Sequence, residues 1–150
     1  MPEQNHQSPD SLSIVVFSGD FDKVHYALVM ASAAAAINKP TQLFFTMDAC
    51  TALLKADGDG AHPWQAMPVS SASYHTGGDM DRAFAERQVA TFEELITSSA
   101  ELGVTFMICE MGLRALGMTR DNLRNDIKFT EGGVVSFLNA ASKDGAVVFI

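Results

Sequence analysis

Short apolar runs alternate with longer segments of helical character along most of this 150-residue chain. The apolar runs predict five strands, at residues 11–17, 42–46, 104–109, 127–129 and 146–150. Strands that alternate with helices usually form a parallel sheet with helices packed on both of its faces. We therefore expect an α/β fold with a mainly parallel sheet.

The segments between these runs predict the helices. Capping and stop signals predict a helix over 21–38, which ends before Pro40, and a second helix over 48–55. The apolar pattern predicts one helix over 81–102. Two short helices are expected, one over 110–116 and one opened by Gly132 and Gly133. The Gly-, Pro- and Ser-rich stretch 56–81 lacks periodicity, which is typical of a lid, a binding loop or a docking segment.

The domain organisation is simple. Residues 1–10 are polar without an apolar pattern and predict a mobile tail, and residues 11–150 predict a single domain. The first residues lack the features of a secretory signal, and no apolar run has the roughly 20 residues that a membrane span needs. We expect a cytoplasmic protein.

The net charge of the chain limits the classes of partner that it is expected to bind. With Lys+Arg 10 against Asp+Glu 18, the formal net charge is -8. Such a chain repels phosphate backbones and anionic lipids, so nucleic-acid and membrane-surface binding are not expected. In the reducing cytoplasm, the two cysteines would remain thiols.

Cys109 is the leading candidate for chemistry, because it stands where the third apolar run ends and a short helix begins. The carboxyl ends of parallel strands form the ligand crevice of an open α/β sheet, and helix-start N–H groups favour a thiolate there. Gly112 is expected to leave space for an added sulfur atom, and an i to i+4 pair of Glu110 with Arg114 would mute the effect of that carboxylate on the thiol. The alternative is a buried, unreactive cysteine.

Polar residues after the first strand are weaker candidates. Asp20 and Lys23 fit a helix cap and a solvated ion pair, or contacts to a ligand at the sheet edge. His25 fits a proton donor to the crevice or a packed core histidine. The Ser18-Gly19-Asp20 turn lacks the glycine pattern of a phosphate cradle, so no nucleotide or flavin cofactor is expected.

The stretch 56–81, the long connection, contains residues that could in principle ligate a metal. His62 and His75, with Asp59 or Asp79, have irregular spacing, so we expect no metal site.

Several fragments together carry a family resemblance. In chain order they are Ser18 to Lys23, Leu43 to Thr46, Phe92 to Leu95, Glu101 to Val104, Cys109 to Gly112, Leu116 to Met118, Glu131 to Val134 and Val148 to Ile150. With the Ala-rich helix after the first strand, they make almost everything after Asp10 resemble the DsrE/DsrF-like family, especially its DsrE-family, peroxiredoxin-like subgroup.

The resemblance implies a three-layer α/β sandwich, frequent homo-oligomerisation, and sulfur carriage or transfer through a persulfide on the cysteine that ends the third strand, which is Cys109 here. The implied donor or acceptor is a small sulfur-carrier or rhodanese-like protein. The sequence departs from the subgroup at Met47 to Cys50, where an aromatic-Gly step is usual, and in the connection through Trp64 and His75.

Cys50 follows the second strand and is a candidate resolving thiol for an oxidised Cys109, the alternative being helix packing. Two further functions remain open for the chain. One is a non-catalytic oligomeric module that binds a small molecule or a protein and has an inert Cys109. The other is a thiol peroxidase, which only the subgroup's name suggests.

Overall fold

Five parallel strands form one sheet in the order β4-β3-β2-β1-β5. The structure, a computed structural model, describes residues 7–150. The strands are β1 (Leu12–Val16), β2 (Thr41–Phe45), β3 (Thr105–Cys109), β4 (Phe129–Gly132) and β5 (Ala146–Phe149). The expected α/β architecture with a parallel sheet is confirmed.

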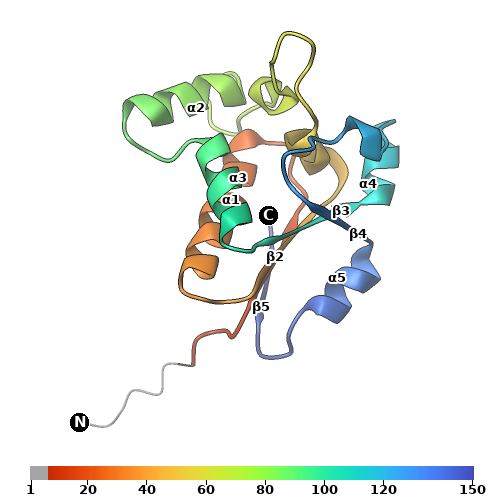
Figure 1. The fold of residues 1–150 in the computed structure, drawn as a ribbon. Helices are drawn as coiled ribbons and strands as arrows, with labels where there is room; N and C mark the ends of the chain where they lie inside the picture. The colour runs from red at the N-terminus through yellow and green to blue at the C-terminus, as the bar shows by residue number, and fades with distance from the viewer. Residues whose placement is uncertain (1–6) are drawn as a thin grey trace, which may run out of the picture.

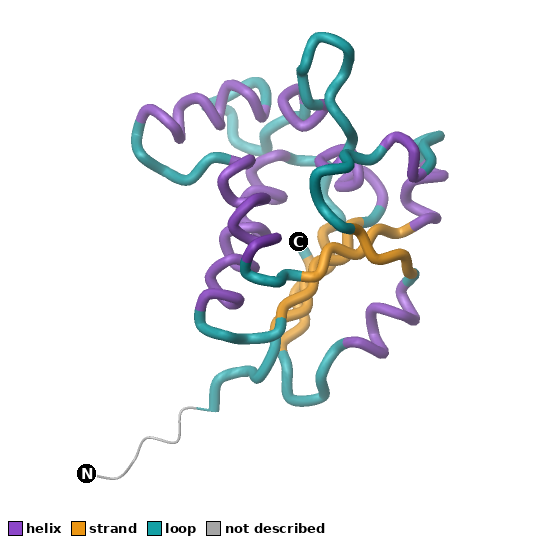
Figure 2. Tube along the Cα trace, in the orientation of Figure 1, coloured by secondary structure: helices purple, strands orange, loops and turns teal. Residues whose placement is uncertain are grey.

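Helices lie on both sides of the sheet (Figure 1). α1 (Phe21–Ala36) and α3 (Phe92–Glu101) cover one face, and α5 (Val134–Ala140) crosses the other. Figure 2 shows the same arrangement as a twisted layer of strands with α1 and α3 on one side and the short α5 on the other. The remaining helices are α2 (Gly77–Glu86), α4 (Glu110–Ala115) and the 3₁₀ helices η1 (Met47–Leu53), η2 (Pro63–Ala66) and η3 (Arg120–Asn122). Within residues 7–150, no helix combines the length and apolar character needed to cross a membrane.

The main core lies between the sheet and α1 with α3. Alternate strand residues face it, so Ile14 of β1 and Leu43 of β2 are fully buried side by side. Helix α1 contributes Val24, Leu28 and Ala31, whose spacing places them on one helical face. Burial of this stripe fixes the helix on the sheet.

The second face of the sheet is covered only in part. Phe137 of α5 packs on Phe44 with 5.3 Å between ring centroids, and the two form a small cluster with Met107 and Cys109. Beyond α5, toward the β5 edge, large apolar side chains are exposed: Phe17, Val147 and Phe149. The part of this face near β5 therefore has no helix over it.

Two helices replace the single one expected over 81–102. α2 ends at Glu86, Gln88 adopts a positive φ of 59°, and α3 starts after Thr91. A reciprocal cap sets this start, since the Thr91 N–H donates to Glu94 Oε2 at 2.9 Å and the Glu94 N–H donates to Thr91 Oγ1 at 3.4 Å. The Thr-x-x-Glu signal was present in the sequence but hidden within a continuous helical pattern.

Other boundaries shift as well. The fourth strand covers 129–132 rather than 127–129, and the stretch 56–81 contains η2 and the first residues of α2. Of the expected mobile tail 1–10, residues 1–6 lie outside the described residues. The rest contacts the domain, because the Asp10 N–H donates to the carbonyl of Asp144 at 3.1 Å and Lys39 Nζ donates to Ser8 Oγ at 2.9 Å.

Candidate functional site

Cys109 is the last residue of β3 and the N-cap of α4, at the carboxyl edge of the sheet. Its neighbour across the sheet is Gly132 of β4. Because α4 begins at Glu110, the chain turns away directly after the thiol. The position matches the edge at which parallel α/β sheets bind ligands.

A surface cavity of about 370 Å³ lies beside Cys109. It is lined by Cys109, Glu110, Met111, Arg114, Glu131, Gly132 and Gly133. A second cavity, of about 310 Å³, adjoins it, since Glu110 and Arg114 line both. Each volume is large enough for a small ligand.

The charges at the cavity wall are not paired as expected. In the described part of the chain, no ion pair joins Glu110 to Arg114, so the expected i to i+4 pair is absent; instead Glu131 pairs with Arg120. Arg114, which lines the same cavity as Cys109, is therefore a permanent cation without an ion-paired carboxylate among residues 7–150.

The thiol itself is enclosed. Cys109 is only 2% exposed, and it packs with Phe44, Met107 and Phe137 on the second face of the sheet. Its side chain makes no capping hydrogen bond to α4. The residue is at the expected edge, but its sulfur is shielded from solvent.

Gly112 does not leave the expected space for an added sulfur. A Cβ atom built on Gly112 would lie 2.5 Å from the backbone N of Met47 and 3.2 Å from Cys50 Sγ. The glycine is needed because α4 packs closely against η1. Its function is packing between these two helices, so it opens no room at Cys109.

Cys50 belongs to the main core rather than to the Cys109 cluster. It is fully buried, and its thiol donates a weak hydrogen bond to the carbonyl of Phe45 at 3.7 Å. Burial, and secondarily the nearby Cys109, raise the pKa of Cys50 to about 12. A protonated, enclosed thiol is a poor nucleophile, so these features do not favour the resolving role.

The polar candidates after β1 lie elsewhere. Lys23 Nζ is 3.6 Å from Asp20 Oδ2 in a solvent-exposed pair, and Asp20 lines a different cavity, of about 520 Å³, with Asp48. His25 is 5% exposed, and its Nε2 is 2.8 Å from the carbonyl oxygen of Ala90. The structure thus brings Arg114 together with Cys109 at one cavity, and leaves Asp20, Lys23 and His25 out of it.

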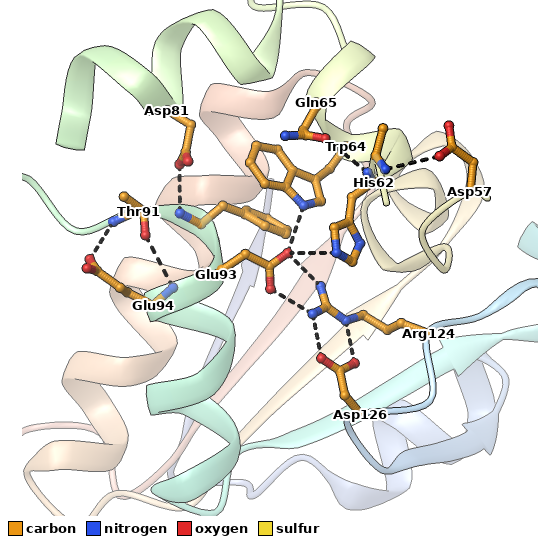
Figure 3. A network of polar contacts seen from close by, with 12 residues as sticks. Asp57, His62, Trp64, Gln65, Asp81, Thr91, Glu93, Glu94, Arg124 and Asp126 are labelled. Atoms are coloured by element: carbon orange, nitrogen blue, oxygen red, sulfur yellow. Dashed lines mark hydrogen bonds and ion pairs between the residues drawn. The ribbon is translucent and has the colours of Figure 1, made fainter. Parts of the chain in front are cut away.

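A polar network supports the loops around the sheet edge (Figure 3). Arg124, only 5% exposed, donates hydrogen bonds to the carboxylates of Glu93 and Asp126. Trp64 Nε1 also donates to Glu93, at 2.9 Å, and His62 Nε2 lies 3.8 Å from the same carboxylate. The network joins three parts of the chain: the stretch 56–81, α3 and the segment before β4.

The hydrogen bonds from Arg124 explain the acidity of its partners. Burial raises the pKa of Glu93, but hydrogen bonds from Arg124 and Trp64 outweigh that effect and hold the pKa below its ordinary value. For Asp126 the hydrogen bond from Arg124 is the largest cause of a lowered pKa. Both carboxylates are therefore ionised at neutral pH.

Glu131, Gly132 and Gly133 were not singled out as site residues from the sequence. The strand expected at 127–129 ended too early to bring them to the edge, although β4 pairs with β3 and so ends beside Cys109. The glycine pair that follows an apolar strand was the available signal. Among residues 7–150, no group of three or more metal-ligating side chains occurs.

Comparisons with known proteins agree with the fold. A model of the DsrE/DsrF/DrsH-like family matches residues 8–149. The uncharacterized protein YrkE of Bacillus subtilis (strain 168) is 27% identical over 157 residues, covering 92% of this chain and 95% of that protein. The solved structure of a protein of unknown function, MTH1491 from Methanobacterium thermoautotrophicum, superposes with a TM-score of 0.53 at 15% identity, over 93% of this chain and 98% of that one.

Proposed function

Because the chain belongs to the DsrE/DsrF/DrsH-like family, which is associated with sulfur relay, we propose that it is a cytoplasmic sulfur carrier or sulfurtransferase that holds sulfane sulfur on Cys109. One observation carries the proposal: Cys109 ends β3 at the wall of a ligand-sized cavity that also contains Arg114. A thiol for group transfer needs such a site, with room for a donor and a positive charge nearby.

The proposed reaction is a thiol–persulfide exchange. The Cys109 thiolate attacks the outer sulfur of a donor R–S–SH, the donor's S–S bond breaks, and R–S⁻ leaves and takes up a proton. The new S–S bond leaves Cys109 as a persulfide. Attack by an acceptor thiolate on the outer sulfur repeats the exchange and returns Cys109 to its thiolate.

Arg114 supports this chemistry as an anion-holding residue. Its guanidinium stays charged at any physiological pH, and it lines the same cavity as the thiol. A terminal persulfide sulfur is anionic near neutral pH, so a cation at the cavity wall stabilises the loaded state. For the donor and acceptor we propose a small sulfur-carrier or rhodanese-like protein.

We also propose that the chain forms a homo-oligomer through the uncovered part of the second sheet face. Parallel sheets are normally covered on both faces, yet Phe17, Val147 and Phe149 remain 46%, 55% and 67% exposed. Phe17 and Phe149 lie 5.3 Å apart between ring centroids and form a continuous apolar surface. A second copy that covers this surface removes it from water.

The enclosure of Cys109 favours a second candidate function. A thiol that is 2% exposed and surrounded by Phe44, Met107 and Phe137 fits a non-catalytic binding module in which Cys109 is a packing residue. The two candidates differ in whether this sulfur reacts.

Sulfur loading tests the proposal. The protein is incubated with glutathione persulfide, and intact mass spectrometry without reductant should show a gain of one sulfur atom. Cys109→Ser should abolish the gain, and Cys50→Ser, the matched control, should retain it. Equal loading of wild type and Cys109→Ser, or no loading of wild type, would reject the persulfide assignment and favour the binding module.

A further inference from the structure

Helix α5 is held to the domain by a single side chain. Of its seven residues only Phe137 is buried, at 2% exposure, whereas Val134, Val135 and Leu138 are 54%, 72% and 57% exposed. Within residues 7–150, one hydrogen bond ties α5 to another element: Gln42 Nε2 donates to the carbonyl oxygen of Phe137 at 3.2 Å. Every strong attachment of this helix thus passes through residue 137.

That same side chain belongs to the buried cluster that contains the thiol. Phe137 stacks on Phe44, and both rings share the small cluster that encloses Cys109. Cys109 also lines the cavity formed with Glu131 and Gly133. Removal of the Phe137 ring would therefore take away one of the three buried side chains that share this cluster with Cys109.

The topology lets α5 lift without detaching. Its chain leaves β4 at one edge of the sheet and returns as β5 at the opposite edge, so it must cross the second face. Before the helix stands Gly133, where a Cβ atom would meet nothing within 4 Å, so no packed side chain surrounds this residue, and glycine has a wide choice of backbone conformations. After the helix, Ser142 Oγ donates to Asp10 Oδ2 at 3.1 Å and fixes the far end.

We propose that α5 is a hinged cover of Cys109, with Phe137 as the residue that controls access to the thiol. The cover swings about Gly133 while the 142–145 turn stays in place, and it exposes Cys109 without unfolding the main core. Its significance for sulfur exchange rests on the proposed function. The cover itself does not depend on that function, and its test uses no sulfur donor.

Thiol labelling tests this cover, with Cys50 as an internal control. Wild-type protein is treated with N-ethylmaleimide over a series of low urea concentrations, and peptide mapping reads the two cysteines separately. We expect Cys109 to react faster than Cys50 at a rate independent of urea, as for a local opening, and Cys50 to react only through global unfolding, with a rate that rises steeply with urea.

Substitutions test whether Phe137 controls access to Cys109. Phe137→Ala should speed the labelling of Cys109 by about tenfold to a hundredfold, because it removes the one buried anchor of α5. Phe137→Leu, which keeps an apolar side chain, should give a smaller increase and serves as the test if the alanine variant fails to fold. Val135→Ala, on the exposed side of the same helix, should leave the rate unchanged.

Leu28→Ala in the main core controls for general destabilisation, and it should speed the labelling of both cysteines only through global unfolding. Equal rates and equal urea dependence of Cys109 and Cys50 in wild type would overturn the proposal. So would a Cys109 rate that neither substitution of Phe137 changes. Neither result depends on whether the protein accepts sulfur, so a failure of the cover and a failure of persulfide formation are distinguishable.

Discussion

Arg124 holds the Glu93 carboxylate from two directions, with Nη2 2.7 Å from Oε2 and Nη1 3.1 Å from Oε1. The same guanidinium donates to Asp126 through Nε and Nη2, at 2.7 Å each. One buried cation therefore joins α3 to the segment before β4, and Trp64 adds the long connection through Glu93. This geometry allows a stability prediction.

Arg124→Met is expected to lower the free energy of unfolding by about 1–3 kcal/mol, because it removes the guanidinium from both carboxylates and leaves Glu93 with Trp64 as its side-chain donor. Urea denaturation followed by circular dichroism measures it. Arg82→Met is the matched control, because Arg82 is 72% exposed and 3.7 Å from Asp79, and its loss should change stability by less than about 0.5 kcal/mol. Equal effects of the two substitutions would contradict the role of the network.

The same network predicts a pH dependence. The pKa values of Glu93 and Asp126 are lower in the folded protein than their ordinary values of 4.5 and 3.8. Their contribution to stability is therefore complete above those values and is lost as the pH falls through the lower, folded-state pKa values. Unfolding free energies measured from pH 7 to pH 3 should decline more steeply below pH 4.5 in wild type than in Arg124→Met. Parallel curves would show that these carboxylates are not the source of the decline.

Gly112→Ala should destabilise the protein by about 1–3 kcal/mol, since the new methyl group would lie 2.5 Å from the Met47 backbone N and must push α4 away from η1. Thermal and urea unfolding measure the change. Gly58→Ala is the control: a Cβ there meets nothing within 4 Å, and the substitution should leave stability unchanged or slightly raised. A neutral Gly112→Ala variant would mean that α4 can move away from η1 without loss of stability.

Mild peroxide should distinguish Cys109 from Cys50. The pKa of Cys50 is raised to about 12, chiefly by burial, so this thiol stays protonated at neutral pH and should not close a disulfide. Intact mass spectrometry should show stepwise addition of oxygen that peptide mapping assigns to Cys109, and Cys50→Ser should behave like wild type. Loss of two hydrogens in wild type but not in Cys50→Ser would instead establish the resolving role.

The uncovered sheet face predicts an effect on assembly. Phe149→Ser should lower the mass measured by sedimentation velocity, because it replaces the more exposed ring of the Phe17–Phe149 pair with a polar side chain. Tyr26→Ser removes an aromatic side chain of comparable exposure, 61%, from α1 on the opposite side of the sheet, and should leave the mass unchanged. An unaltered mass in Phe149→Ser would place any oligomer interface elsewhere.

The sequence was sufficient to predict the alternation of strands and helices, because the short apolar runs of the strands differ in length and periodicity from the longer helical segments between them. It also placed Cys109 at the end of β3, since the apolar run stops there. The division between α2 and α3 was missed, because the cap at Thr91 acts inside a pattern that remains amphipathic on both sides.

The contacts of the site were harder to predict, because they depend on how distant elements pack. From the sequence, Gly112 was expected to leave space for an added sulfur atom. Only the position of Met47 shows that backbone atoms fill that space. The burial of Cys109 likewise involves Phe137, which joins the same cluster because α5 crosses the sheet. Neither relationship leaves a local pattern in the chain.

The place of β5 in the sheet also affects the order in which the chain can fold. Leu12 of β1 pairs with Thr41 of β2 on one side and with Ala146 of β5 on the other. On the ribosome, β1 can therefore meet β2 early, but its second edge stays bare until residues 146–149 have emerged. An unpaired strand edge is prone to association with other chains, so β1 of the nascent chain is open to mispairing along this edge until β5 joins it.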